Sequence, residues 1–176
     1  RVQDKFISMN LEKKLSAIDS LIRHSFEELE IPGMAVGIAT DGRTVFARGY
    51  GLRDHTDMES QVTSRTLFAI ASCTKAFTTY ALDCLVNQDG ILNWDDQVTN
   101  YIPEFRLDDI HATNNMRIKD LVTHVSGLPR HDLIWSRSDF PRPEVLARIA
   151  HIQASCDFHR KFQYNNLMYA VAGVLT

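Results

Sequence analysis

The sequence contains one pair of clear β-strand patterns, and both lie within its first 51 residues. The stretches MAVGIAT (34–40) and TVFARGYG (44–51) are rich in apolar or β-forming residues and flank Asp41-Gly42. This dipeptide suits the positive-φ positions of a tight hairpin turn, so we predict two antiparallel strands. No further strand alternation follows from residue 91 onward. Because two strands are too few for an independently stable sheet, the pattern predicts an α+β protein whose sheet needs additional chain.

Helical patterns surround this hairpin. Before it, apolar residues recur at helical spacing between Asn10, a good N-cap, and the helix breaker Pro32-Gly33, which predicts a helix with one buried face. After it, residues 52–66 are polar and indicate a loop. A second, longer helix is then expected to end at Gly90. The residues expected on its buried face are Phe77, Tyr80, Ala81, Cys84 and Leu85.

The second half of the chain indicates a small helical region in which prolines and glycines separate short helices. We predict one helix in RIKDLVTH (117–124) and one near Pro143, with Val145, Leu146 and Ile149 facing inward. A third helix is expected after Asn166, through LMYAVAGVL (167–175). That apolar pattern runs to Thr176 without a polar tail or a capping signal. We therefore expect the domain to continue beyond this chain.

Composition limits the classes of partner. With 176 residues and 44% hydrophobic residues, the chain suits one medium-sized domain or part of a larger one. The 19 basic and 22 acidic residues form no long run of either sign, so we expect neither nucleic acid nor an anionic membrane surface as a partner. No apolar run approaches the roughly 20 residues that cross a bilayer, so no membrane span is expected. A small-molecule partner is favoured.

Three cysteines, Cys73, Cys84 and Cys156, lack C-x-x-C or Cys/His metal spacing. An odd number without such spacing indicates neither a disulfide scaffold nor a zinc site. We expect no metal. Cys73 as a thiol nucleophile is an alternative. Against it, free cysteine usually behaves as a small core residue, and no histidine partner is marked for Cys73.

Ser72 and Lys75 form the motif S-x-x-K near the start of the long helix. A separation of three puts both side chains on the same helix face. A serine hydroxyl becomes a useful nucleophile when a neighbour accepts its proton, and a helix N-terminus stabilises an oxyanion. The alternative is that Ser72 only caps the helix and that Lys75 is solvated.

Tyr164, Asn165 and Asn166 form a second motif, Y-x-N. The phenol of Tyr164 can shuttle a proton, and the amide of Asn166 can orient a lysine and a substrate carbonyl. The alternative is that Tyr164 is an ordinary buried tyrosine and that Asn166 caps the following helix.

A Ser/His/Asp triad is a further alternative. Ser126 has His124, His131 and Asp132 nearby in the sequence. The absence of a G-x-S-x-G nucleophile elbow around Ser126 argues against this interpretation.

The conjunction of S-x-x-K and Y-x-N resembles the serine β-lactamase and penicillin-binding protein superfamily. Tyr164 at the first position of the second motif is similar to class C β-lactamases, D-alanyl-D-alanine carboxypeptidases, D-aminopeptidases and family VIII esterases, whereas class A enzymes have Ser-Asp-Asn there. The stretches LVTHVSGLPRHDLIW (121–135) and FQYNNLMYAVAGVL (162–175) look like the CubicO group of class C-related hydrolases. The resemblance covers nearly the whole chain.

The resemblance implies a β-lactamase/transpeptidase-like α+β fold, in which an antiparallel sheet with flanking helices meets a helical subdomain. Residues 1–66 would form the N-terminal helix and hairpin of the α/β part, 67–90 the nucleophile helix and 91–176 the helical subdomain. The family's third motif, Lys or His followed by x-Gly, should lie well downstream of Tyr164. Only ten residues follow Asn166, so the resemblance implies a truncated, N-terminal portion of the fold.

The resemblance also implies roles for the two motifs. Ser72 would be the acylated nucleophile, Lys75 its proton acceptor and Tyr164 the base in acylation and the partner in deacylation. Asn166 would position Lys75 and the substrate. The expected function is a serine hydrolase that acts through an acyl-enzyme on an amide, ester or β-lactam carbonyl, without metal or organic cofactor.

Two alternatives to this hydrolase stay open: a penicillin-binding sensor that deacylates slowly, and a non-catalytic structural member or fragment. The expected substrate is a small molecule or a peptide. The resemblance favours a periplasmic or secreted location, with a cytoplasmic location as the alternative.

Overall fold

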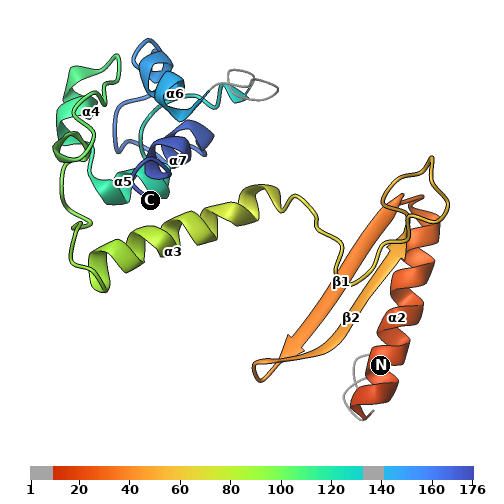
Figure 1. The fold of residues 1–176 in the computed structure, drawn as a ribbon. Helices are drawn as coiled ribbons and strands as arrows, with labels where there is room; N and C mark the ends of the chain where they lie inside the picture. The colour runs from red at the N-terminus through yellow and green to blue at the C-terminus, as the bar shows by residue number, and fades with distance from the viewer. Residues whose placement is uncertain (1–9, 133–140) are drawn as a thin grey trace. The chain divides into compact units, whose positions relative to one another are not determined.

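The computed structural model describes residues 10–132 and 141–176 (Figure 1). Contacts divide the chain into two compact units, Arg1–Ala69 and Ile70–Thr176.

The first unit consists of a helix and a β-hairpin. Helix α2 (Leu11–Glu28) begins at its N-cap Asn10, whose side chain accepts a hydrogen bond of 3.0 Å from the Lys13 N–H. Strands β1 (Gly33–Thr40) and β2 (Arg43–Gly51) pair antiparallel, with one register shift between Ile38 and Ala39. The predicted helix start and the predicted hairpin are confirmed.

The hairpin turn has the backbone that its sequence predicts. Asp41 and Gly42 join β1 to β2 (Figure 1). Their φ values are 50° and 72°, the left-handed values that a two-residue turn of type I′ requires. Gly49 in β2 has a different reason to be glycine. A Cβ atom there would lie 2.2 Å from the Val62 carbonyl oxygen, so the absence of a side chain lets the 52–66 loop approach the strand.

Helix α2 contacts β2 through a polar cluster and one aromatic pair. Tyr50 donates a hydrogen bond of 2.6 Å to Asp19, which also pairs with Arg48, and the rings of Phe26 and Tyr50 are 6.1 Å apart. The predicted buried face of this helix is wrong, because no residue of α2 is buried. Leu21, for example, is 64% exposed. A two-stranded hairpin offers too little surface to cover the apolar stripe of an 18-residue helix.

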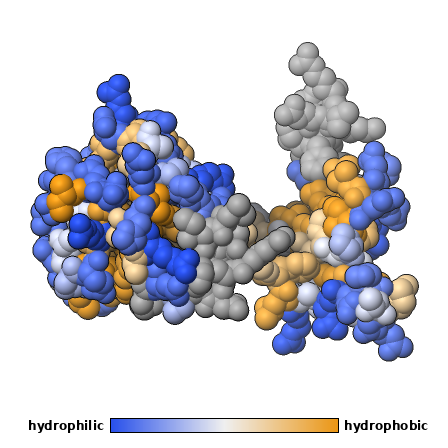
Figure 2. All heavy atoms as spheres, turned by 90° about the horizontal axis from the view of Figure 1, so that it is seen from above, coloured by the Kyte–Doolittle hydropathy of each residue, from blue (hydrophilic) through white to orange (hydrophobic). Residues whose placement is uncertain are grey.

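The second unit is helical (Figure 1). It contains the hydrophobic core. Leu82 from the long helix and Leu121, Leu167 and Val171 from shorter helices are fully buried in it. Hydrophobic side chains also reach the molecular surface among hydrophilic ones (Figure 2). The elements of the unit are η1 (Ala71–Cys73), α3 (Thr74–Asn87), η2 (Val98–Asn100), α4 (Ile110–Asn115), α5 (Ile118–Thr123), α6 (Arg142–Ile149) and α7 (Asn166–Ala172).

The three short helices predicted in the second half are confirmed. Helix α5 ends at Thr123, before His124 in a left-handed conformation with φ of 63°. In α6, Val145, Leu146 and Ile149 are buried as expected. The idea that Asn166 caps α7 is wrong, because Asn165 is the N-cap. The Asn165 side chain accepts a 3.0 Å hydrogen bond from the Met168 N–H.

Two details of the expected long helix are wrong. The α-helix occupies Thr74–Asn87 rather than 67–90, with a 3₁₀ turn before it and Gly90 three residues beyond its last residue. Its buried residue is Leu82, while Phe77 and Tyr80 are 66% and 62% exposed. Apolar residues occur on several sides of this helix, so periodicity alone could not select the side that packs against α7. Within residues 10–132 and 141–176, no helix has the length and apolar character needed to cross a membrane.

Candidate active site

Ser72 lies in the 3₁₀ turn that leads into α3. The caps of this turn and of α3 are Ile70 and Cys73, and neither has a side-chain capping hydrogen bond. The capping interpretation of Ser72 is therefore wrong. Ala71, directly before it, has φ of 46°, a left-handed conformation that costs a non-glycine residue about 1–3 kcal/mol. Such strain is found where surrounding structure fixes the backbone, often at functional sites.

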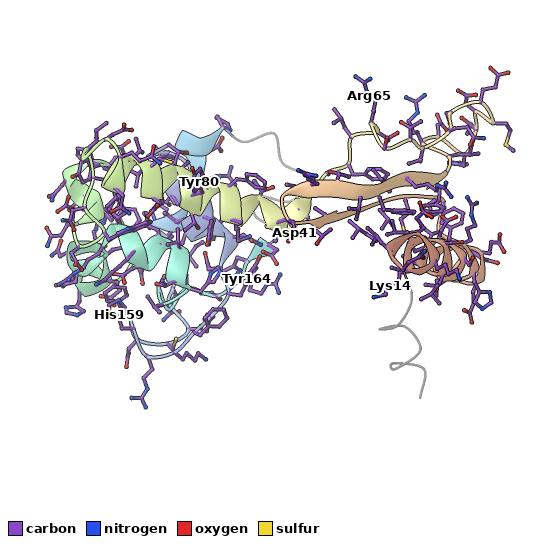
Figure 3. All side chains as sticks on the ribbon, turned by 90° about the horizontal axis from the view of Figure 1, so that it is seen from below. Lys14, Asp41, Arg65, Tyr80, His159 and Tyr164 are labelled. Atoms are coloured by element: carbon purple, nitrogen blue, oxygen red, sulfur yellow. The ribbon has the colours of Figure 1, made fainter. Side chains whose placement is uncertain are left out.

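The Ser72 hydroxyl contacts both partners that the motifs suggested. Its Oγ atom lies 2.7 Å from the Tyr164 Oη atom and accepts a 3.2 Å hydrogen bond from the Lys75 Nζ atom. Lys75 is in the first turn of α3, three residues after Ser72 and on the same helix face. Tyr164, labelled in Figure 3, lies on the segment just before α7. The fold thus brings S-x-x-K and Y-x-N into contact.

Asn166, the first residue of α7, completes the cluster. Its Oδ1 atom accepts a 2.6 Å hydrogen bond from Lys75 Nζ, and its Nδ2 atom donates one of 2.8 Å to Asp132 Oδ1. The Lys75 ammonium also lies over the rings of Tyr164 and Tyr169, at 4.8 Å and 5.1 Å from their centroids. Two acceptor oxygens and two aromatic faces therefore hold the lysine head group in place.

Hydrogen bonding by Lys75 is the main cause that lowers the pKa of Tyr164 below its usual value of 10. A hydrogen bond with Ser72 and the positive charges of Lys75 and Arg130 act in the same direction, against the effect of burial. The Arg130 guanidinium lies 5.2 Å from the centroid of the Tyr164 ring. The phenol is consequently easier to deprotonate than a free tyrosine, which suits a proton acceptor.

His124 supports the segment that carries Tyr164. Its Nδ1 atom accepts a 3.1 Å hydrogen bond from the Asn165 N–H, and its carbonyl accepts one of 2.7 Å from the Gln163 N–H. Its ring lies 4.6 Å from that of Tyr164. Burial, and then the charge of Lys75, lower the pKa of His124. A neutral imidazole with an unprotonated Nδ1 atom fits the observed hydrogen bond.

The alternative triad does not form among the described contacts. His124 bonds to the backbone of Asn165, Ser126 accepts a hydrogen bond from the Leu128 N–H, and Asp132 contacts Arg130 and Asn166. The interpretation of these residues as a Ser/His/Asp triad is wrong. Cys73, the alternative thiol nucleophile, is exposed.

Sequence reasoning missed Tyr169 and Arg130 and gave Asp132 a different role, as a member of a Ser/His/Asp triad. Tyr169 is the only one with a usable signal, since it follows Asn166 by three residues on α7 and therefore shares its helix face. Arg130 and Asp132 come from an irregular segment after α5, where no periodicity indicates a side-chain direction.

A pocket of about 410 Å³ opens beside the cluster, between α3 and α7. Ser72, Lys75 and Thr78 line one side, and Asn166, Tyr169 and Ala170 line the other. Among the described residues, no three His, Cys, Asp or Glu side chains are grouped in a way that could hold a metal ion. The cluster itself offers a hydroxyl, an amine, a phenol and an amide, which are groups for nucleophilic and proton-transfer chemistry.

The sequence matches the model of a known family and is similar to curated proteins from Staphylococcus aureus and Aspergillus campestris. The family model Beta-lactamase matches residues 18–176. The protein Flp of Staphylococcus aureus strain NCTC 8325 is 31% identical over 162 residues, which cover 90% of this chain and 32% of Flp. The unguisins hydrolase UngD′ of Aspergillus campestris is 31% identical over 163 residues, which cover 88% of this chain and 30% of that protein. The chain spans about a third of the length of these relatives.

Solved structures of a penicillin-binding protein homologue and of an amidase are also similar to this chain. The octameric penicillin-binding protein homologue from Pyrococcus abyssi superimposes with a TM-score of 0.75 at 26% identity, over 90% of this chain and 37% of that chain. D-amino acid amidase from Ochrobactrum anthropi gives a TM-score of 0.69 at 25% identity, over 86% of this chain and 41% of that chain. These likenesses cover the N-terminal part of a larger fold.

Proposed function

Because this chain belongs to the β-lactamase family, we propose that it carries the nucleophile and the proton-transfer groups of a serine hydrolase that forms an acyl-enzyme on Ser72. The observation that supports this most directly is the position of the Ser72 hydroxyl, within hydrogen-bond distance of both Tyr164 and Lys75. The substrate group is an amide, ester or β-lactam carbonyl in a small molecule or a peptide.

In acylation, the Tyr164 phenolate accepts the proton of Ser72 as Oγ attacks the carbonyl carbon. The 2.7 Å contact is within the range that direct proton transfer needs. Lys75 donates hydrogen bonds to Ser72 and Asn166 and places positive charge beside the Tyr164 phenolate, which is consumed in this step, and beside the serine alkoxide, which develops.

Collapse of the tetrahedral intermediate expels the leaving group, which takes the proton from Tyr164. The Ser72 backbone N–H supplies one donor to the oxyanion of this intermediate. In deacylation, Tyr164 accepts a proton from water, the resulting hydroxide attacks the ester carbonyl, and Ser72 regains its proton as the acid is released. The two steps together consume one water, regenerate Ser72 and Tyr164, and need no metal or organic cofactor.

Relatives with hydrolytic names support this reaction class. One is named a hydrolase of unguisins and another is a D-amino acid amidase. Both cleavages consume water, and the second acts on an amide. The Ser72, Lys75, Tyr164 and Asn166 constellation is suited to the same chemistry on a carbonyl compound.

A second candidate is a penicillin-binding sensor, which is acylated on the same serine and deacylates slowly. The likeness to the penicillin-binding protein homologue of Pyrococcus abyssi favours it as the second candidate. Turnover separates the two functions, because a sensor retains the adduct that a hydrolase releases.

Intact-protein mass spectrometry with a fluorophosphonate serine probe tests the shared step. We expect a single adduct that is absent in Ser72→Ala and retained in Cys73→Ala, the matched variant of the neighbouring exposed residue. Absence of any adduct on the folded full chain would contradict an activated Ser72 and would favour a non-catalytic member. An adduct that persists in Ser72→Ala would place the reactive group elsewhere.

A further inference from the structure

We propose that Asp132 is a positioning residue that fixes the amide of Asn166 with its oxygen toward Lys75. This inference rests on the proposed function, in which Lys75 assists Ser72. The contact that carries it is the 2.8 Å hydrogen bond from Asn166 Nδ2 to Asp132 Oδ1, between residues 34 positions apart.

The hydrogen-bonding capacities of the three side chains define the orientation of the amide. Lys75 Nζ is a donor only, so the partner 2.6 Å away must be the Asn166 oxygen. The amide nitrogen then points to the opposite side, where it needs an acceptor. An ionised carboxylate accepts and cannot donate, so Asp132 satisfies that side in only one amide orientation.

Rotation of the amide by half a turn would reverse both contacts. The Asn166 NH₂ group would face the Lys75 ammonium, and the Asn166 oxygen would face the Asp132 carboxylate. Donor would meet donor and acceptor would meet acceptor. Lys75 would lose its shortest hydrogen bond and with it the position from which it reaches Ser72, 3.2 Å away.

Asp132 is itself held by Arg130. The second carboxylate oxygen, Oδ2, accepts a hydrogen bond of 2.9 Å from Arg130 Nε and forms an ion pair with Arg130 Nη2 at 2.6 Å. The two oxygens of Asp132 therefore have separate tasks, one toward Asn166 and one toward Arg130. The Arg130 guanidinium also lies over the Tyr164 ring. The Asp132 carboxylate therefore contacts Asn166 directly and is connected to Tyr164 through Arg130.

A double-mutant cycle on the full chain tests this role, with the rate of fluorophosphonate labelling of Ser72 as the readout. Asp132→Ala should slow labelling about 10- to 100-fold, as expected for loss of a hydrogen bond to a charged group. In an Asn166→Ala background, Asp132→Ala should have no further effect, because no amide is left to orient. Equal slowing in both backgrounds would overturn the proposal, because a residue with only a structural role would slow labelling by the same factor whether or not Asn166 is present.

Two more variants separate the contact with Asn166 from the contact with Arg130. Asp132→Asn keeps the size of the side chain and offers either an oxygen or an NH₂ group to Asn166. Its labelling rate should therefore lie between those of wild type and Asp132→Ala. Arg130→Gln removes the guanidinium that contacts Asp132 Oδ2 and leaves Asn166 Nδ2 its acceptor, so it should slow labelling less than Asp132→Ala does. The rates are compared at a pH above the pKa of Tyr164 in both variants, where the charge of Arg130 no longer changes the fraction of phenolate. A full loss of rate in Arg130→Gln under that condition would mean that Asp132 acts through Arg130 and would overturn the proposal.

A nuclear magnetic resonance measurement reports on the amide without requiring catalysis. The Asn166 side-chain NH₂ signals are identified by their loss in Asn166→Ala. The hydrogens of this group should exchange slowly with solvent, and their exchange rate should rise in Asp132→Ala. An unchanged exchange rate in Asp132→Ala would overturn the proposal. If wild-type Ser72 is not labelled, the proposed function fails, and this comparison still decides whether Asp132 orients Asn166.

Discussion

The hydroxyl oxygens of Ser72 and Tyr164 lie 2.7 Å apart, although 92 positions separate these residues in the sequence. The contact depends on α5 and α7, because His124 at the end of α5 bonds to the backbone on both sides of Tyr164. Lys75 then bridges Ser72 to Asn166, the first residue of α7. Each side chain of the cluster is thus held by an element other than its own.

Tyr164→Phe should slow acylation of Ser72 by about 10²- to 10⁴-fold, the usual contribution of a positioned general base. The ring remains to pack against His124, so the folded structure should persist. Labelling kinetics with a fluorophosphonate, combined with circular dichroism, check both statements. Tyr101→Phe is the matched control, because the Tyr101 hydroxyl bonds to Asp96, outside the cluster. Equal rates for wild type and Tyr164→Phe would contradict the role of this phenol.

Lys75→Met should also slow acylation, by about 10²-fold or more, because the methionine side chain keeps the bulk and loses the charge and the donors. Asn166 and Ser72 then both lose a hydrogen bond. Lys119→Met provides the control, since Lys119 pairs with Asp95 on the surface. The comparison of the two labelling rates measures the effect. A loss of equal size in Lys119→Met would indicate a general effect of charge.

The labelling rate should rise with pH and reach a plateau above the pKa of Tyr164, because a base acts in its deprotonated form. Hydrogen bonding by Lys75 lowers this pKa, so the midpoint should lie below 10. Arg130→Gln removes one of the positive charges that lower it and should move the midpoint upward. Arg106→Gln, at an exposed position, should leave the midpoint in place. A rate that falls with rising pH would contradict the assignment.

Acid should destabilise the unit that contains His124. Burial lowers the pKa of this histidine in the folded state, so the unfolded state binds the proton more readily. The stability that the neutral imidazole contributes is present above the unfolded pKa of about 6.5 and is lost as pH falls through the folded value. Urea unfolding at a series of pH values measures this dependence.

His124→Asn should flatten that pH dependence, and asparagine tolerates the left-handed backbone at this position. It should also cost about 1–3 kcal/mol at neutral pH, because the N–H of buried Asn165 loses a well-placed acceptor. His151→Asn, at an exposed position, should preserve the wild-type profile. An unchanged profile in His124→Asn would mean that another group causes the acid dependence.

Local signals explain why much of the fold was predictable. Asp41-Gly42 and Asn10 act through their immediate neighbours, so the hairpin and the start of α2 followed from short-range chemistry. The resemblance carried by two motifs predicted the fold class and the superfamily, and both are confirmed. The assignment of residues 1–66 to an α/β part and of residues 91–176 to a helical subdomain stays a prediction, whereas the helix expected over 67–90 is shorter, at Thr74–Asn87.

The remaining features depend on contacts between distant segments. Phe77 and Tyr80 belong to a helix with apolar residues on several sides, and only the packing of Leu82 against the core decides which side is buried. Asp132 follows an irregular stretch of backbone, so no local pattern indicates the direction of its carboxylate. Its contact with Asn166 becomes visible only when α7 is positioned beside that stretch.

The most direct test of the acyl-enzyme account is acid-quenched peptide mapping by mass spectrometry during reaction of the full chain with a p-nitrophenyl ester. The account predicts one acyl group on the peptide that contains Ser72, which appears with release of p-nitrophenol and disappears when the ester is consumed. An adduct that forms and persists would favour the sensor. Release of p-nitrophenol with the acyl group on another residue, or no acyl group on a folded chain, would contradict the account.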